Sequence, residues 1–333
     1  MKRLFLKTIV AAVAVAACGL ASAQERTIKF TTQNPKGHPL VMGMEKFAEI
    51  VQAKSGGKIK VNLFPGGVLG GDAPVVSALQ GGTIEMASMN SGILASQVKD
   101  FAVFDYPFMF ANGKEADAVV DGPFGKKMHA KLEPKGLIGL TYWELGFRSI
   151  TNSKRPITKV EDMEGLKLRV IPNAINVDWV KALGANHTPL AFPELYAALE
   201  QKAIDGQENP ISVINANKFF EVQKYVTLTN HQYNPQSVLM SKKFWDSLNP
   251  AEQKIITEAA AESTVYQRQQ ARLQDVTALD AVKKGGMQVT ELSAAELAKF
   301  REKMKPVLEK HGASTPEAVL ELTGELAKIR AAK

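Results

Sequence analysis

Cysteine is almost absent from this chain of 333 residues, which carries a single one at position 18. A disulfide framework is therefore excluded, and the fold must be stabilised by its hydrophobic core. Histidine is also scarce, and no spacing among the five residues builds a metal site, so we expect neither a metal nor another cofactor. The five are His38, His129, His187, His231 and His311.

Sequence motifs of common catalytic centres are missing as well. There is no Gly-x-Ser-x-Gly elbow, phosphate-binding loop or dinucleotide fingerprint, and the glycine cluster of residues 66–71 has the wrong spacing for any of them. The neighbouring acids Glu161 and Asp162 fall in an expected loop and helix start, where solvated or capping roles are the usual ones. Since no acid–base pair can be named, we predict that the protein is not an enzyme.

Concentrated charge and long apolar runs are lacking after residue 23. The formal net charge of the whole chain is +7, and its basic residues are spread out without interleaved aromatics. Such a mild surplus is not the footprint of a nucleic-acid-binding protein. No later segment offers the ~20 apolar residues that a membrane span needs, so we expect a soluble mature protein.

The N-terminus has the organisation of a secretory signal peptide. Lys2, Arg3 and Lys7 form a basic start, residues 8–17 are apolar, and residues 21–23 (Ala-Ser-Ala) supply the small residues that signal peptidase reads. We therefore expect residues 1–23 to be a removed signal peptide and the mature protein to be periplasmic.

Cys18 leaves one alternative open. Residues 15–18 (Val-Ala-Ala-Cys) loosely match a lipoprotein processing box, in which the cysteine would be lipidated and become the first residue. We favour cleavage after Ala23, which leaves a mature chain without cysteine.

The rest of the chain alternates between strand and helix patterns, which favours a parallel-type α/β fold. Asn249 as cap and Pro250 at the first position begin a long helix without a heptad seam, which we interpret as a strut across two lobes. The spacing predicts strands at 27–32, 58–64, 83–89, 136–143, 166–170, 203–206 and 237–241, and helices at 40–55, 73–80, 177–183, 193–201, 250–284, 293–310 and 316–329.

Five stretches, taken in order, resemble one known family, the DctP-type solute-binding proteins of tripartite ATP-independent periplasmic (TRAP) transporters. The resemblance covers essentially the whole mature chain. The stretches lie at residues 146–157 (Gly-Phe-Arg, then Thr-Asn-Ser-Lys-Arg-Pro-Ile), 165–170 (Gly-Leu-Lys-Leu-Arg-Val), 183–196, 205–210 (Asp-Gly-Gln-Glu-Asn-Pro) and 218–225.

The resemblance implies a two-lobed α/β clamp, the Venus-flytrap fold of periplasmic binding proteins, with a ligand cleft between the lobes. It also implies a small organic acid as ligand and a pair of membrane subunits as partner, driven by an ion gradient. We expect lobe I to comprise residues 24–146 and 235–274, and lobe II residues 147–234 and 275–333. Ligand is expected to close the lobes about crossovers near residues 145–150 and 230–236.

Arg169 is the main candidate for binding a carboxylate. Its planar guanidinium matches both carboxylate oxygens and stays charged at any relevant pH. It ends a predicted strand that opens onto Pro172 and Asn173, although spacing alone favours a surface arginine or a structural ion pair. By resemblance, Arg169 is the family's principal carboxylate clamp.

Three further residues have roles by resemblance. Arg148 corresponds to a second cationic contact, the alternative being an ion pair that braces the crossover. Asn209 corresponds to a ligand contact, the alternative being turn chemistry before a proline. Phe192 corresponds to an aromatic wall of the site, and Trp143 is an equally balanced choice between wall and core. Arg155 precedes a proline in an expected loop, and we interpret it as structural.

Lobe I is expected to read the variable part of the ligand through the loop Gln33-Asn34, through Asp72, and through Asn90 in the segment of residues 88–91. Sialate-binding members of the family carry charged residues near the last of these, where this chain has Asn90 and the apolar Ile93, so a sialic acid does not fit. A smaller acid with a neutral or apolar tail fits better, while four-carbon dicarboxylates and hydroxy, oxo or aromatic monocarboxylates stay open. Two other functions also stay open: a binding protein for an ATP-driven importer or signalling receptor, and an exported carboxylate-processing enzyme.

Overall fold

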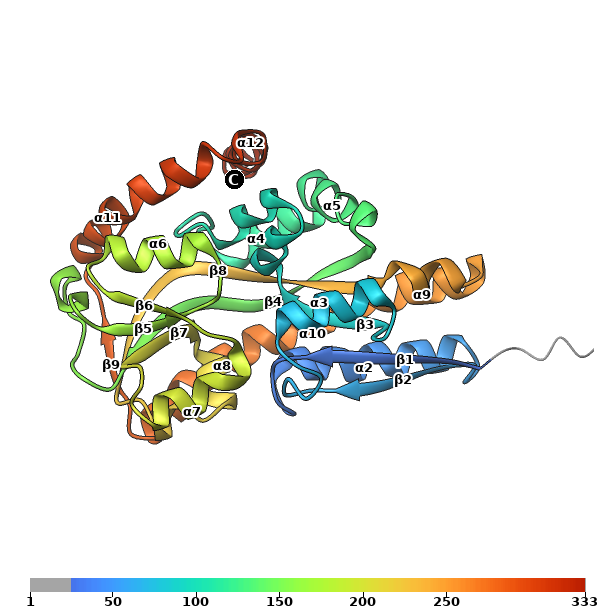
Figure 1. Cartoon of the computed structure of the whole chain (residues 1–333), viewed down its shortest axis with the longest axis horizontal. Coiled ribbons are helices and arrows are strands. Elements are labelled where there is room, and N and C mark those ends of the chain that lie inside the picture. The colour runs from blue at the N-terminus through green and yellow to red at the C-terminus, as the bar shows by residue number, and fades with distance from the viewer. Residues whose placement is uncertain (1–24, 333) are drawn as a thin grey trace, which may run out of the picture.

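The computed structural model of the chain describes residues 25–332, so the expected signal peptide, with Cys18, lies outside the described residues. A mixed sheet of nine strands runs through the centre of the described part (Figure 1). Its strands are β1 (Arg26–Thr32), β2 (Ile59–Phe64), β3 (Met86–Asn90), β4 (Leu137–Asn152), β5 (Lys167–Val170), β6 (Asn186–Pro189), β7 (Gly206–Pro210), β8 (Tyr225–Ser241) and β9 (Gln288–Glu291).

The sheet is parallel at its two ends and antiparallel in its centre. The strand order is β2-β1-β3-β8-β4-β7-β5-β6, and β9 pairs with the first residues of β8. β1 pairs in parallel with β2 and β3, and β5 with β6 and β7, whereas the pairs β3–β8, β8–β4 and β4–β7 are antiparallel. The predicted parallel-type sheet is therefore wrong for the centre.

The two central strands are much longer than the sequence predicted. β4 continues from the predicted 136–143 to Asn152, and β8 begins at Tyr225 rather than at residue 237. Most side chains of β8 are buried, polar ones such as Asn234 and Gln236 included, so its pattern does not alternate between apolar and polar. In β4 the register against β8 shifts on either side of Gly146, whose φ of +115° favours glycine.

Eleven helices cover this sheet within the described residues, apart from short 3-10 turns. Of the seven helices that the sequence predicted, each overlaps a helix of the structure. The set is α2 (Pro39–Lys54), α3 (Asp72–Gly81), α4 (Gly113–Asp121), α5 (Pro123–Ala130), α6 (Ala174–Ala182), α7 (Leu195–Glu200), α8 (Ile211–Ala216), α9 (Lys242–Ser247), α10 (Pro250–Lys284), α11 (Ala294–Gly312) and α12 (Pro316–Ala331).

The elements gather into two lobes joined by β4, β8 and α10 (Figure 1). We name the side with β1, β2, β3, α2 and α3 lobe I, and the side with β5, β6, β7, α6, α7 and α8 lobe II. The predicted long helix has the predicted bounds, and it packs against α2 of lobe I and α8 of lobe II. It begins with a capping box, in which Asn249 accepts from the Glu252 amide and Glu252 accepts from the Asn249 amide.

The C-terminal helices cross from one lobe toward the other. α11 packs against α6, while α12 packs against α4, where Arg330 of α12 forms an ion pair with Glu115 (2.7 Å). The proposed division places residues 275–333 in lobe II and residues 24–146 in lobe I, so α12 packs against elements of the other proposed lobe. The residue bounds of the lobes therefore stay a proposal.

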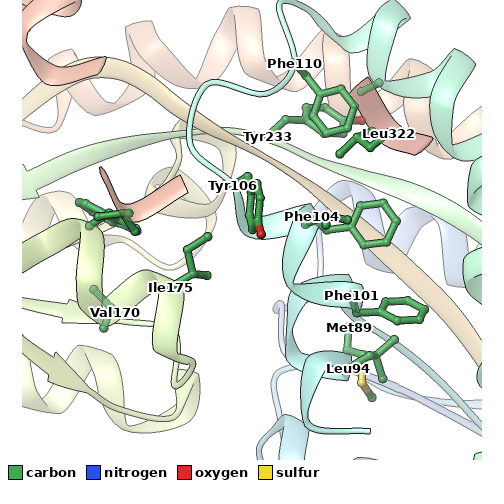
Figure 2. Close-up of a cluster of buried hydrophobic side chains, with 14 of the residues drawn as sticks. Met89, Leu94, Phe101, Phe104, Tyr106, Phe110, Val170, Ile175, Tyr233 and Leu322 are labelled. Carbon is green, nitrogen blue, oxygen red and sulfur yellow. The ribbon is translucent and has the colours of Figure 1, made fainter. Parts of the chain in front are cut away.

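A cluster of buried hydrophobic side chains joins these elements (Figure 2). Phe101 and Phe104 enter it from a 3-10 segment (η2, Lys99–Asp105), and Leu322 of α12 lies beside Phe110. The same cluster includes Ile175 of α6, so apolar packing extends from the helices above lobe I into lobe II. Each Å² of apolar area buried in this cluster stabilises the folded state by roughly 25 cal/mol.

Candidate functional site

A cavity of about 170 Å³ lies between the lobes. The loops that follow β1, β3, β5 and β6 meet there with the middle of β4 and β8, since the carboxyl ends of parallel strands in each lobe face the cleft. Of the eight residues that the sequence predicted for the site, all but Trp143 line this cavity. They are Gln33, Asp72, Asn90, Arg148, Arg169, Phe192 and Asn209.

The two lobes touch beside the cavity. A Cβ atom added to Gly67 would lie 3.0 Å from Cγ of Pro193, and one added to Gly71 would lie 3.5 Å from Cβ of Ala191. These glycines belong to the loop before α3, and the other two residues belong to the segment between β6 and α7. The structure therefore describes the clamp in a closed arrangement.

Arg169 enters the cavity from the last part of β5. Its Nε donates to the carbonyl oxygen of Leu190 (2.8 Å), and its guanidinium lies 5.8 Å from the ring centroid of Phe192. Burial lowers the pKa of Arg169 to about 10, with the nearby charges of Glu208 and Asp72 opposing that shift and Arg148 adding to it, so the group stays protonated at neutral pH. Among the described residues Arg169 forms no salt bridge, and a buried cation without a partner attracts an anion.

Arg148 is held differently, although it lines the same cavity. Its guanidinium forms a buried, bidentate ion pair with Glu208 of β7, with Nη2 2.9 Å from Oε1, and it also donates to the Glu208 carbonyl (2.6 Å). Burial alone would raise the pKa of Glu208, but Arg148 and the nearby His231 side chain lower it to about 2. The ion pair that the sequence left open as an alternative is therefore present, and Arg148 reaches the cavity with its charge balanced.

Asn209 and Phe192 complete the lobe II wall. Asn209 lies within β7 rather than in a turn, because the strand runs from Gly206 to Pro210 instead of the predicted 203–206. Its Nδ2 donates to Oε1 of Gln207 (2.6 Å), which fixes the amide beside the cavity. Phe192 begins a short 3-10 turn (η5, Phe192–Glu194) after β6, and its ring centroid lies 6.1 Å from that of Phe219, with the two rings tilted by 58°.

Lobe I contributes buried polar atoms that have no hydrogen-bond partner within residues 25–332. They are Oε1 of Gln33, Oδ1 of Asn34, Oδ1 of Asp72 and Nδ2 of Asn90, and all four residues line the cavity. The amide of Gln33 is oriented by donation from its Nε2 to the Gly70 carbonyl (3.0 Å), which leaves its oxygen free. The amide of Asn90 accepts at Oδ1 from the Gly92 amide (2.7 Å), which leaves its nitrogen free as a donor. Buried polar groups rarely stay unpaired, so these atoms indicate a polar ligand.

Asp72 is the one acidic side chain among the residues that line the cavity. It is the first residue of α3, and the N-terminus of a helix stabilises a negatively charged carboxylate. Burial raises the pKa of Asp72 to about 6, against the opposing effects of the Arg169 charge and of Gln33. The group is therefore mostly ionised at neutral pH and mostly protonated below about pH 5.

Trp143 belongs to the core of lobe I rather than to the cavity. It is 1% exposed, and its ring lies 5.8 Å from that of Phe30. Arg155 has a structural role, as expected, because its Nε donates to the Asp162 carbonyl (3.0 Å) and its Nη2 donates to the Glu164 carbonyl (2.5 Å). A single aromatic residue in a strand carries no sequence signal that separates core from pocket.

Sequence reasoning missed several lining residues, chiefly Asn234 and Gln236, whereas Asn34 belongs to the loop with Gln33 that it expected to contact the ligand. Gln236 donates to Oδ1 of Asn234 (3.0 Å), and Asn234 donates weakly to buried Asp105 (3.5 Å). The only signal in the sequence was the polar run Asn-Pro-Gln at residues 234–236, which lies in one of the two expected crossovers.

Asp105 links the site to lobe II. Besides Asn234, it accepts hydrogen bonds from the side chains of Asn173 and Asn176 at the start of α6. Burial raises the pKa of Asp105 to about 6, while the Asn173 and Arg148 side chains oppose that shift. This buried carboxylate therefore holds η2 and α6 together across the cleft.

Comparison with known proteins identifies the family. The family model described as "Bacterial extracellular solute-binding protein, family 7" (DctP) matches residues 30–315. A TRAP periplasmic solute-binding protein from Ochrobactrum anthropi is 54% identical, with a TM-score of 0.83, over 94% of this chain and 98% of that one. The sugar-acid-binding protein DctPAm from Advenella mimigardefordensis, solved with galactonate, is 44% identical, with a TM-score of 0.90, over 92% and 99%.

A curated relative agrees with the solved structures. The C4-dicarboxylate-binding periplasmic protein DctP of Rhodobacter capsulatus is 35% identical over 311 residues, which are 92% of this chain and 93% of the relative. This chain therefore belongs to family 7 of the bacterial extracellular solute-binding proteins, the DctP family.

The membership confirms the predictions of fold and function class. The protein is the periplasmic solute-binding subunit of a TRAP transporter, a carrier of a small organic acid that works with TRAP membrane subunits and is not an enzyme. Within residues 25–332, no helix combines the length and the apolar character needed to cross a membrane.

Proposed function

We propose that the cavity captures a small hydroxylated monocarboxylate of the sugar-acid type. One observation carries this proposal. A buried Arg169 without a salt bridge faces the same cavity as four unpartnered polar atoms of lobe I, on Gln33, Asn34, Asp72 and Asn90. A carboxylate at Arg169 and hydroxyl groups along the lobe I wall would satisfy both sets.

Lobe I offers mainly hydrogen-bond acceptors. Gln33, Asn34 and Asp72 each present a free oxygen, and Asn90 presents a free N–H. A hydroxyl group donates one hydrogen bond and accepts others, so a row of hydroxyls pairs with such a wall. A wholly apolar tail would leave the same atoms buried and unpaired, at a cost of about 1–3 kcal/mol each.

Size and relatives support the same class. The cavity of about 170 Å³ is smaller than the ~300–1,000 Å³ pockets that hold drug-sized ligands. The relative from A. mimigardefordensis is a sugar-acid-binding protein in complex with galactonate. The R. capsulatus relative is named for C4-dicarboxylates, and it has the lower identity of the two.

The test is a thermal-shift screen of the mature protein against aldonates, uronates, four-carbon dicarboxylates and aromatic monocarboxylates. A tight ligand stabilises the folded state by mass action, by about 2.7 kcal/mol at a hundred times its dissociation constant. We expect an aldonate or a uronate to give the largest increase in Tm. An aromatic acid or an unhydroxylated dicarboxylate as the best ligand, with no response to any sugar acid, would overturn the proposal.

A further inference from the structure

The charged side chains that line the cavity can neutralise only one ligand carboxylate. Arg148, Arg169 and Asp72 are the charged residues that line it. Arg148 is already balanced by the bidentate ion pair with Glu208, which is itself fully buried. Arg169 is therefore the single cation in the lining without a salt-bridge partner.

The opposite wall carries the negative charge of Asp72. Among the described residues of lobe I, no Lys, Arg or His lines the cavity; the lobe I lining is instead made of amides, small residues, Ile93 and Asp72. Asp72 is close enough to Arg169 for the two charges to interact, although they form no salt bridge. A ligand bound by one end to Arg169 would therefore share the cavity with the carboxylate of Asp72 on the lobe I wall.

We propose that Asp72 is a specificity-determining residue that excludes a second carboxylate, so that the protein selects sugar monoacids over diacids of the same length. This inference rests on the proposed function, in which Arg169 binds the first carboxylate. A terminal CH₂OH group can donate a hydrogen bond to the unpartnered Oδ1 of Asp72. A terminal carboxylate at the same place would meet a like charge in a desolvated site, which is strongly unfavourable.

The test uses pairs of acids that differ only at the far end. Galactonate and galactarate share six carbons and the same configuration, and erythronate and meso-tartrate form the same kind of pair with four carbons. Affinities are measured by calorimetry at pH 8, where both carboxylates of the diacids are ionised and Asp72, with a pKa of about 6, is ionised too. We expect the wild-type protein to prefer the monoacid in at least one pair by tenfold or more.

Asp72→Asn keeps the size of the side chain and removes its charge. We expect it to reduce the monoacid-to-diacid preference by at least tenfold. Asp246→Asn is the matched control, because it removes the same charge from an exposed residue of α9 whose side chain is 54% accessible. It should leave the preference unchanged, which separates a local charge effect from an effect of net charge.

The outcomes distinguish the inference from the proposed function. If the wild-type protein binds neither acid of either pair and responds to no sugar acid in the thermal-shift screen, the proposed function fails and this inference fails with it. If it responds only to sugar acids outside these pairs, the inference alone fails. If it binds a monoacid but the preference is absent, or is the same in Asp72→Asn, only the inference fails. Should Asp72→Asn bind no acid measurably, Asn34→Asp adds a carboxylate to the same wall; a wider preference supports the inference, and an unchanged or narrower one overturns it.

Discussion

Arg148 and Glu208 form a buried, bidentate ion pair across the neighbouring antiparallel strands β4 and β7. Nη2 of Arg148 lies 2.9 Å from Oε1 of Glu208 and 2.6 Å from its carbonyl oxygen, and both side chains are at most 1% accessible. His231 approaches the same carboxylate at 3.4 Å. Arg148 lines the cavity and Glu208 does not, so the pair holds this cation in place and neutralises its charge at the site.

Breaking this pair on one side should destabilise the protein. Glu208→Gln leaves Arg148 charged, buried and unpaired, which typically costs about 3–5 kcal/mol. Chemical denaturation of the ligand-free protein measures the loss. The double variant Arg148→Met/Glu208→Leu is the control and should lose less, because no charge stays buried. An unchanged free energy of unfolding for Glu208→Gln would contradict this account.

Arg169 should dominate the affinity for every ligand. Arg169→Lys keeps the positive charge but loses the planar fork, so binding should weaken clearly. Arg169→Ala should weaken it further, by about 2–5 kcal/mol, which is the usual cost of truncating one partner of a buried charge pair. Calorimetry measures both. Arg155 donates to the backbone carbonyls of Asp162 and Glu164, so the control variant Arg155→Ala should bind as the wild type does. If the Arg169 variants also bind as the wild type does, Arg169 is not the carboxylate clamp.

Asn90 should affect the choice among acids rather than the capture of all of them. Asn90→Ala loses both the free Nδ2 and the oxygen that caps the following turn at Gly92. Asn90→Ser keeps a capping oxygen and loses only the amide donor. In a matrix of affinities for several carboxylates, both variants should change the ranking. Equal weakening for all acids, or a change in the alanine variant alone, would assign Asn90 to the turn instead.

Ligand should close the lobes about the crossovers at residues 145–150 and 230–236. The structure places irregular pairing of β4 with β8 on either side of Gly146, within the first of these segments. Small-angle scattering should therefore give a smaller radius of gyration with saturating ligand than without it. A radius that stays the same with a ligand shown to bind would count against hinge closure.

Asp275 should make stability depend on pH between about 4 and 7. Burial raises the pKa of this α10 carboxyl to about 7, against hydrogen bonds from Ser212. The folded state then holds the proton more tightly than the unfolded state, so this contribution to stability falls as pH rises from about 4 to 7. Asp275→Asn should gain stability relative to the wild type across that range, by up to ~4 kcal/mol. Denaturation midpoints at several pH values measure it, and a difference that is constant with pH would refute it.

Two buried histidines affect the same measurement with the opposite dependence of stability on pH. Buried His38 and His129 have pKa values lowered to about 3 by desolvation, so they favour the folded state more as pH rises from about 3 to 6.5. The wild-type curve alone therefore mixes effects of both signs. The comparison between variant and wild type isolates the carboxyl group.

Local pattern determined much of this protein from the sequence alone. The caps at Asn249 and Pro250 and the glycine after Lys284 gave the long helix its bounds, because helix ends depend on neighbouring residues. The resemblance gave the family and seven residues that line the cavity. Four of the seven, Arg148, Arg169, Phe192 and Asn209, lie in the short contiguous stretches that carry the resemblance.

Only the tertiary structure decided the rest, because it depends on which distant strands become neighbours. Burial of polar residues along β8 hid its length, and the pairing of β4 with β7 brought Glu208 to Arg148. The same packing left Arg169 without a salt bridge and placed Trp143 in the core. The sequence supplies the charged and polar groups of the site, but their net charge at the cavity follows from which of them the fold pairs with one another.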